Sequence, residues 1–317
     1  MKFRLAIIAG LALGLAIYTV TLIKTKYPFI PEPADEMIAL KQTDPALLKW
    51  RESSRINLNM QEPQGIAIAP SGSLYVAGDR AIQVYDAAGN HTTSWNLPDQ
   101  ARCLAVGSDG AVYAGVRDHV ERYQPNGGGR QVWQTPQAGA EITSLSINGN
   151  IVWAADAGNR LYWRCDTAGH VTGSFGRKDA KKKAPGLIVP SLHLDLIALP
   201  GGRLLAANPG RHTVDSYQPD GMVRSSWGVE GNGIDAFCGC CNPTDIALLP
   251  DGNIVTAEKG LPRVKVYNPG GKLESVVAGC EEFPLNPMGI DIAVDSSGRI
   301  VVLDPLAKVI RIFVRKQ

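Results

Sequence analysis

The sequence has almost no charge imbalance. Its 317 residues include 32 Lys and Arg against 30 Asp and Glu, which gives a formal net charge of +2. Proteins that bind nucleic acid usually gather a strong positive excess on one face. Nothing in the overall balance points to such a surface, so we expect no nucleic-acid partner.

The sequence is also poor in aromatic residues and in histidine. Aromatics make up 7% of the chain and histidine occurs five times, whereas glycine occurs 34 times, a composition that suits many tight turns. No Ser-His-Asp order, phosphate-binding loop or pair of catalytic carboxylates stands at a recognisable spacing. These absences leave any catalytic role open.

Only one long apolar run is present. Residues 5–23 carry no charge, and basic residues flank them on both sides. As a helix these nineteen residues span about 28 Å, close to the roughly 30 Å hydrocarbon core of a membrane. The run lacks the small-x-small cleavage site of a secretory signal. An uncleaved signal anchor is therefore predicted in preference to a cleaved signal.

The anchor divides the chain into four predicted parts. We expect residues 1–4 to form a cytoplasmic tail, residues 5–23 to cross the membrane, residues 24–52 to form a juxtamembrane spacer, and residues 53–317 to form an exported domain. The flanking basic residues are tied in number, and the α-amino group favours an N-inside orientation. This predicts a single-pass protein of the inner, cytoplasmic membrane with its domain in the periplasm or an equivalent extracytoplasmic space.

A sixfold repeat fills the exported part. In each unit a glycine turn separates two apolar strands. A third strand then ends in an aromatic residue, or in Cys165 in the third unit. A period of about 40–50 residues with several short strands is typical of a β-propeller blade. The pattern predicts an all-β, six-bladed β-propeller. The turn glycines are Gly72, Gly110, Gly149, Gly202, Gly252 and Gly298.

The last unit lacks a fourth strand, because the chain ends soon after residues 312–314. Residues 54–59, just ahead of the first repeat, alternate polar and apolar side chains with the period of a strand. An unpaired edge would expose a row of backbone groups. We therefore predict that this N-terminal strand closes the last blade. Innermost strands are predicted at residues 66–68, 104–106, 145–147, 196–199, 246–249 and 292–294.

The amino-acid sequence of the repeats resembles that of the NHL-repeat family. The resemblance is carried by residues 64–68 with 71–77, by 155–160, and above all by 250–255 with 263–267. It covers about 250 residues and implies a binding platform or, in some members, a lyase or lactone hydrolase. Residues 241–247 are similar to a sequence motif of the peptidyl-amidoglycolate lyase branch. That branch has a histidine before the cysteine that corresponds to Cys238, whereas this sequence has Phe237 there.

Four cysteines are predicted to share one rim of the propeller, which we call the Cys rim. In such a fold the links into each inner strand, and those between second and third strands, lie on the same side. Cys238, Cys240 and Cys241 enter the fifth blade, and Cys280 enters the sixth. Outside the cytoplasm one of the three is expected to bridge Cys280. The alternative is a thiolate centre for a transition metal or an iron–sulfur cluster.

Three aspartates are predicted at the mouth of the central channel. Asp195, Asp245 and Asp291 precede the inner strands of the fourth, fifth and sixth blades. Converging carboxylates suit a hard cation such as Ca²⁺. Alternatively, each aspartate caps backbone N–H groups at the start of its own strand.

Histidines and basic residues complete the Cys rim. His119, His193 and His212 are candidate zinc ligands, although each alone also suits a solvated or hydrogen-bonded position. A ring of basic side chains is a candidate site for an anionic ligand, although surface ion pairs would give the same pattern. This ring comprises Arg80, Arg117, Arg160, Arg211, Lys259 and Arg263.

The function favoured by these features is binding. We expect a membrane-anchored extracytoplasmic propeller that binds a ligand or a partner protein through its Cys rim. One alternative is a metal-dependent lyase or hydrolase that uses the aspartates and rim histidines at the channel mouth. The other is a thiolate metal or redox centre that serves a membrane complex.

Overall fold

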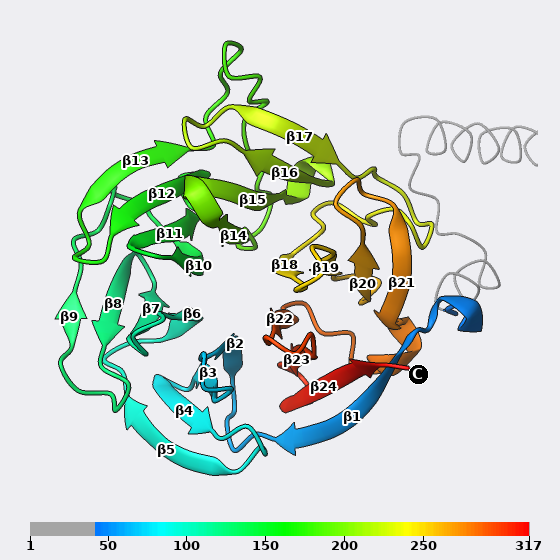
Figure 1. Ribbon diagram of the computed structural model, residues 1–317, viewed down its shortest axis with the longest axis horizontal. Coiled ribbons are helices and arrows are strands. Elements are labelled where there is room, and N and C mark those ends of the chain that lie inside the picture. The colour runs from blue at the N-terminus through cyan, green and yellow to red at the C-terminus, as the bar shows by residue number, and fades with distance from the viewer. Residues whose placement is uncertain (1–41, 317) are drawn as a thin grey trace, which may run out of the picture. The chain divides into compact units, whose positions relative to one another are not determined.

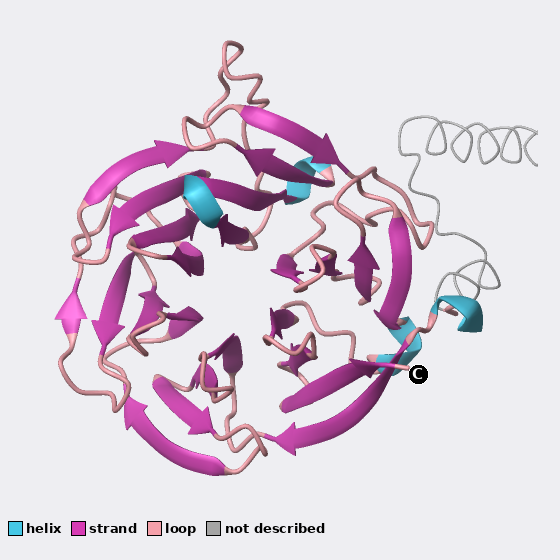
Figure 2. Ribbon diagram, viewed as in Figure 1, coloured by secondary structure: helices cyan, strands magenta, loops and turns pink. Residues whose placement is uncertain are grey.

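Six four-stranded antiparallel sheets make up the part of the chain that this computed structural model describes, residues 42–316. The sheets follow one another around a central axis, and in five of them the first strand in the chain is innermost, whereas in the sixth β1 is outermost (Figure 1). Strands and loops account for nearly all of these residues, and the helices among them are single 3₁₀ turns (Figure 2). The structure confirms the predicted all-β, six-bladed propeller.

The first three blades run continuously along the chain, from the innermost strand to the outermost. Blade 1 contains β2 (Pro63–Ile68), β3 (Leu74–Gly78), β4 (Ala81–Tyr85) and β5 (His91–Asn96). Blade 2 contains β6 (Ala101–Val106), β7 (Val112–Val116), β8 (His119–Tyr123) and β9 (Gln131–Val132). Blade 3 contains β10 (Ile142–Asn148), β11 (Ile151–Asp156), β12 (Leu161–Asp166) and β13 (Val171–Phe175).

The last three blades carry the longer links. Blade 4 contains β14 (Leu196–Leu199), β15 (Arg203–Asn208), β16 (Thr213–Tyr217) and β17 (Val223–Trp227). Blade 5 contains β18 (Asp245–Leu248), β19 (Ile254–Ala257), β20 (Val264–Tyr267) and β21 (Leu273–Ala278). Blade 6 contains β22 (Asp291–Val294), β23 (Ile300–Asp304), β24 (Val309–Arg315) and β1 (Trp50–Asn57). The 3₁₀ turns are η1 (Pro45–Leu47), η2 (Pro200–Gly202), η3 (Pro209–Arg211) and η4 (Cys280–Glu282).

Burial explains why the strands differ in pattern. The second strands β3, β7, β19 and β23 are buried along their whole length, because neighbouring blades cover both of their faces. Such strands read as apolar runs without alternation. The outer strands β5, β13 and β17 are mostly exposed, and each contributes one partly buried ring: Trp95, Phe175 and Trp227.

Glycines in the outer hairpins let neighbouring blades approach closely. Gly127 has φ +82, and a Cβ atom there would lie 2.5 Å from the ring of Trp95 in the preceding blade. Only glycine fits both the backbone conformation and the space. The same contact recurs between Gly169 and Trp133, Gly221 and Phe175, and Gly271 and Trp227.

Strand β1 closes the ring, as the sequence predicted. It pairs antiparallel with β24, from Trp50 opposite Arg315 to Asn57 opposite Val309. The strand therefore begins three residues before the predicted domain boundary at residue 53 and ends before residue 59. In Figure 1 it lies outside β24 and supplies the outer edge of blade 6.

The predicted tail, anchor and first part of the spacer, residues 1–41, lie outside the described residues. Between residues 42 and 316 there is no helix with the length and apolar character needed to cross a membrane.

Candidate functional site

A cavity of about 690 Å³ lies on the propeller axis. All six innermost strands line it, and its size falls in the range of about 300–1,000 Å³ that is usual for ligand pockets. Its polar lining comes mainly from the first residues of these strands, on the Cys rim. The last residues of the strands, such as Ile68, Val106 and Val294, line it with apolar side chains.

Exposed apolar side chains surround the mouth of the cavity on the Cys rim. Leu192, Met288 and Leu306 line the cavity and are 44%, 53% and 49% exposed. They come from the links into blades 4 and 6 and from the β23–β24 link. Large apolar groups held in water at a concave site are typical of a surface that a ligand or partner covers.

The three predicted aspartates do meet at this cavity. Each carboxylate accepts a hydrogen bond from the inner strand of the next blade. Asp195 accepts from the Ile246 N–H at 2.6 Å, and Asp291 accepts from the Ile66 N–H at 2.7 Å. The third bond joins Asp245 to the Ile292 N–H at 3.3 Å.

The predicted caps at the start of each aspartate's own strand account for part of the pattern, because Asp195 also bonds to the Leu196 N–H and Asp291 to the Ile292 N–H. In addition, the aspartates fasten blade 4 to blade 5, blade 5 to blade 6, and blade 6 to blade 1. The register of one strand could not show these links between blades, because the amide N–H that donates to each carboxylate belongs to a neighbouring sheet.

The convergence of carboxyls makes these groups reluctant to ionise. Burial raises the pKa of Asp195 to about 7 and that of Asp291 to about 6. Burial also raises the pKa of Asp245 well above its usual value, and the two neighbouring carboxyls add to the effect. Asp245 therefore resists ionisation and shares a hydrogen bond with the carboxyl of Asp291.

Of the three predicted rim histidines, only His193 lines the cavity. Burial, with Lys259 and Arg102 nearby, lowers the pKa of its imidazole to about 4. The ring is therefore neutral at physiological pH and retains a nitrogen that can accept a proton or a hydrogen bond.

The other two histidines lie elsewhere. His119 on blade 2 contacts Asp118 at 2.9 Å and Glu121 at 3.2 Å. His212, after η3 on blade 4, is buried, and neither ring nitrogen has a partner among the described residues. The structure thus does not assemble the three imidazoles around one point.

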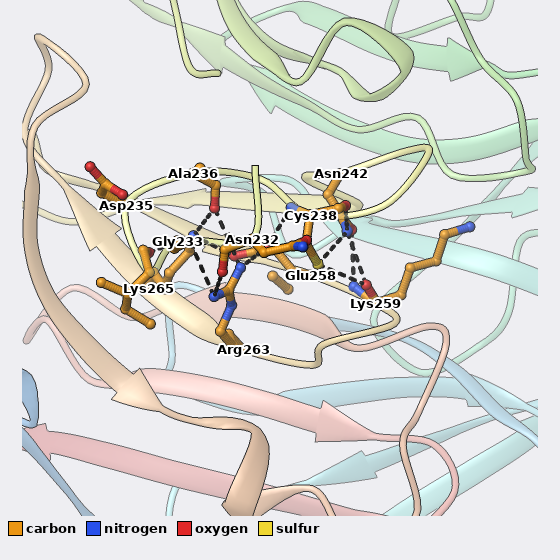
Figure 3. Close-up of polar contacts among 12 residues, drawn as sticks. Asn232, Gly233, Asp235, Ala236, Cys238, Asn242, Glu258, Lys259, Arg263 and Lys265 are labelled. Atoms are coloured by element: carbon orange, nitrogen blue, oxygen red, sulfur yellow. Dashed lines mark hydrogen bonds and ion pairs between the residues drawn. The ribbon is translucent and has the colours of Figure 1, made fainter. Parts of the chain in front are cut away.

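The thiol-rich link into blade 5 is anchored by a buried ion cluster. The Glu258 carboxylate pairs with Arg263 at 2.8 Å and with Lys265 at 2.5 Å, and all three residues are buried. Arg263 and Lys265 also donate to backbone carbonyls of residues 232–236, as Figure 3 shows. Burial lowers the pKa of Lys265 to about 8, and Glu258 opposes that shift.

The four rim cysteines differ in their surroundings. Cys238 and Cys280 are buried, and burial raises the pKa of both thiols, that of Cys280 to about 11. Cys240 is exposed, and its Sγ lies 3.0 Å from the Sγ of Cys241. All six cysteines are free, so the structure does not support the predicted bridge to Cys280.

Cys241 has a polar setting that the other thiols lack. Ser191 Oγ donates to its Sγ at 3.3 Å, and Lys259 Nζ donates to Ser191 Oγ at 2.7 Å. Burial raises the pKa of Cys241, but the hydrogen bonds of Ser191, Cys240 and Lys259 outweigh it, and the thiol pKa ends below its usual value. Cys241 therefore loses its proton more readily than an ordinary cysteine does.

The predicted ring of basic residues does not surround the cavity. Arg263 is buried against Glu258, which corrects its predicted role in ligand binding. Arg211 donates to the carbonyls of Gly186 and Pro185, both at 3.1 Å. Arg80 donates to the Pro98 carbonyl, Arg117 pairs with Asp99 at 3.3 Å, and Arg160 is exposed. Arg102, which the sequence did not single out, is the guanidinium that lines the cavity.

Within residues 42–316 no three His, Cys, Asp or Glu side chains are arranged to hold a metal ion. The carboxyls bond to backbone amides, the imidazoles are apart, and Cys240 and Cys241 are the two thiols whose sulfurs are in contact. This arrangement provides no ligand set for the predicted transition-metal, iron–sulfur or Ca²⁺ centres, which stay predictions.

Sequence reasoning missed the residues that position the site. Ser191 lies in an irregular link whose register cannot be read from strand periodicity. Glu258 directly follows β19, and in the structure its carboxylate pairs with the buried Arg263. An acidic residue at the end of an apolar strand was the one feature of the sequence that could have indicated this cluster.

No family model and no curated protein matches the sequence. Solved structures match over most of its length. A streptogramin B lyase superposes with a TM-score of 0.57 at 12% identity, over 86% of this chain and 100% of that one. The virginiamycin B lyase of Staphylococcus aureus gives 0.56 at 14%, over 84% and 89%. A protein of unknown function from Bacteroides thetaiotaomicron gives 0.59 at 16%, over 83% and 72%. These similarities show the six-bladed fold alone, and membership of the NHL family stays a prediction.

Proposed function

We propose that this protein is a ligand-binding propeller that takes up an amphipathic molecule through its Cys rim. The axial cavity is the observation that carries the proposal. Exposed Leu192, Met288 and Leu306 surround its mouth. Inside the mouth, carboxyls from three blades form a polar part of the cavity wall. An apolar mouth over a polar wall favours a ligand with an apolar body and a polar end.

The charge of that polar end follows from the carboxyls. The carboxyls bond to backbone amides, Asp195 also to Ser144, and Asp245 to Asp291. Because each carboxylate oxygen has more than one lone pair, acceptor capacity remains for a ligand. A cation would favour the ionised carboxylates, which mutual repulsion and burial now disfavour. We therefore propose an ammonium or similar cationic end, carried by a small molecule or by an extended segment of a partner protein.

The cellular setting is proposed from the sequence. The apolar run of residues 5–23 supports a single-pass anchor in the inner membrane, with the propeller on the extracytoplasmic side. In that setting the ligand would come from outside the cytoplasm.

A matched pair of probes tests the proposal. The full-length protein is titrated with octylamine and with octanol, which share a chain but differ in charge, and its unfolding temperature is followed at pH 5 and pH 8. We expect octylamine to raise that temperature more than octanol does, and more at pH 8, where Asp195 and Asp291 ionise. Asp291→Asn should remove most of the difference, whereas Asp251→Asn, at the far end of β18, should keep it. Equal effects of both probes would reject a cationic ligand.

A lyase is the second candidate function. It is favoured by the similarity to streptogramin and virginiamycin lyases, one of them solved as an inactive variant with quinupristin. The neutral imidazole of His193 at the cavity is placed to accept a proton from a bound substrate. Conversion of quinupristin by the wild type, and its loss in His193→Gln, would support this activity. No conversion by the wild type would remove this substrate class from consideration.

A further inference from the structure

Two adjacent thiols on the Cys rim are already in contact. The Sγ atoms of Cys240 and Cys241 lie 3.0 Å apart, about 1 Å beyond the length of a disulfide bond. Cys240 is exposed to solvent, whereas Cys241 is buried behind it. One thiol can therefore meet a dissolved reagent while the other stays in reach of the first.

Hydrogen-bond donors and a positive charge lie next to the inner thiol. Lys259 donates to Ser191, and Ser191 donates to Cys241, so a positive charge stands two hydrogen bonds from the sulfur. Asn242 fixes this geometry: its side chain accepts from the Lys259 N–H at 2.9 Å and donates to the Lys259 carbonyl at 2.9 Å. Nearby positive charge and hydrogen-bond donors are what activate a cysteine.

We propose that Cys240 and Cys241 form a thiol–disulfide exchange site that reacts with disulfides of low-molecular-weight thiols. The outer thiol, Cys240, meets the substrate, and the inner thiol, Cys241, completes the exchange. The site is separate from the axial cavity, whose lining includes neither cysteine.

The exchange proceeds in two displacements. Deprotonated Cys240 attacks one sulfur of the substrate R–S–S–R, which forms a Cys240–S–S–R bond and releases R–S⁻. The Cys241 thiolate then attacks the Sγ of Cys240, which forms the Cys240–Cys241 disulfide and releases the second R–S⁻. The two protons lost by the cysteines convert both leaving groups to R–SH. The protein is oxidised by two electrons, and the substrate is reduced by two.

The product disulfide is readily reversed. Adjacent Cα atoms are about 3.8 Å apart, closer than the roughly 4.4–6.8 Å of most disulfides. A bridge between neighbours is therefore strained and easily reduced, as in exchange sites rather than structural staples. The other four cysteines are buried and lack this Lys–Ser setting, so they are not expected to react.

Thiol counting with oxidised glutathione tests the proposal. The reduced full-length protein should give six free thiols, and the oxidised protein should give four, which is six minus the two that form the bridge. The tryptic peptide of residues 225–259 should become lighter by two hydrogens. Reduced glutathione should restore all six thiols.

Single variants assign the roles. Cys241→Ser should trap one glutathione on Cys240, whereas Cys240→Ser should form neither adduct nor bridge. Lys259→Met should keep both products but slow bridge formation roughly three- to tenfold. Cys103→Ser is the matched control and should react as the wild type does. If Cys241→Ser does not fold, the peptide mass and the Lys259→Met rate decide.

Six thiols that persist with oxidised glutathione would overturn the proposal. So would a bridge that still forms in Cys240→Ser, or one that includes Cys238 or Cys280.

Discussion

Asp195, Asp245 and Asp291 each bind a backbone amide of the following blade, and together they line the cavity. One residue type thus fastens three blade junctions and supplies the acidic wall of the candidate site. Between blades 3 and 4 the Ser146 hydroxyl takes a similar part by accepting from the Ala198 N–H at 3.0 Å. The acidic wall is therefore confined to one side of the axis.

The raised pKa of Asp195 predicts a definite pH dependence. Because the folded state holds the proton more tightly than the unfolded chain does, this carboxyl stabilises the fold most below pH about 3.8, and the contribution is lost as pH rises through about 7. Urea unfolding at several pH values should show the stability of the wild type falling relative to Asp195→Asn between pH 4 and 7.

Glu52, whose pKa is shifted in the opposite direction to that of Asp195, provides the control for this experiment. Hydrogen bonds from Arg55 and Arg311 outweigh burial and lower the pKa of Glu52, so its contribution is lost as pH falls below about 4.5. Glu52→Gln should therefore be less stable than the wild type by a nearly constant amount above pH about 5, and the two curves should converge at the acid end. Parallel curves for wild type and Asp195→Asn from pH 4 to 7 would contradict the assignment.

The buried cluster around Glu258 predicts a large loss of stability on mutation. Glu258→Gln leaves Arg263 and Lys265 buried without their counter-charge, and such a change typically lowers the free energy of unfolding by about 3–5 kcal/mol. The loss should shrink above pH 8, where Lys265 can release its proton. Urea titration at pH 7 and pH 9 measures both effects.

An exposed ion pair offers the comparison. Asp99→Asn breaks the contact with Arg117, whose side chain is 69% exposed, and should leave stability nearly unchanged because solvent screens the pair. A Glu258→Gln effect as small as this would mean that the cluster does not anchor the thiol-rich link.

At the scale of the element, the hairpin glycines govern how blades pack. Gly127→Ala places a Cβ against the Trp95 ring as well as straining a residue at φ +82. Gly252→Ala strains a residue at φ +87 but meets nothing within 4 Å. The first variant should therefore lose about 1–3 kcal/mol more than the second in denaturant unfolding, the usual penalty of overpacking. Equal losses would show that the ring moves aside freely.

Strands were predictable from the sequence where the repeat imposes them. The inner strand at residues 196–199 matches β14 residue for residue, because its apolar run is bounded by Asp195 and Pro200. Outer strand β9 is cut to two residues after the glycines at 127–129, and Trp133 lies just beyond it. Period alone could not indicate this shortening.

The candidate site was only partly predictable, because the repeat sets the register of the strands but not the conformation of the links between them. Strand register placed Asp195, Asp245 and Asp291 at one mouth, since each begins or precedes an inner strand. The links have no period, so the contact of Ser191 with Cys241 was out of reach. The burial of Arg263 depends on a link 30 residues away, which local pattern does not encode.

At the scale of the whole molecule, blade 6 joins the two ends of the described chain. Strand β1 pairs with β24, and Arg311 on β24 donates to Glu52 on β1 at 2.6 Å and also contacts Glu282 after blade 5. This contact ties the first and last strands to the link between blades 5 and 6. The ring therefore closes only when segments about 260 residues apart in sequence have met, which makes closure a late event in a fold of otherwise local pairings.

Removal of β1 should consequently destabilise the entire ring. A chain that begins at Leu58 leaves the edge of β24 unpaired, and we expect aggregation and a lower urea midpoint. A chain that begins at Gln42 keeps β1 and should unfold like the full-length protein. A synthetic peptide of residues 49–58, added to the shorter chain, should restore the midpoint by pairing with β24. A shorter chain that stays monomeric with an unchanged midpoint would show that five complete blades hold the ring without this strand.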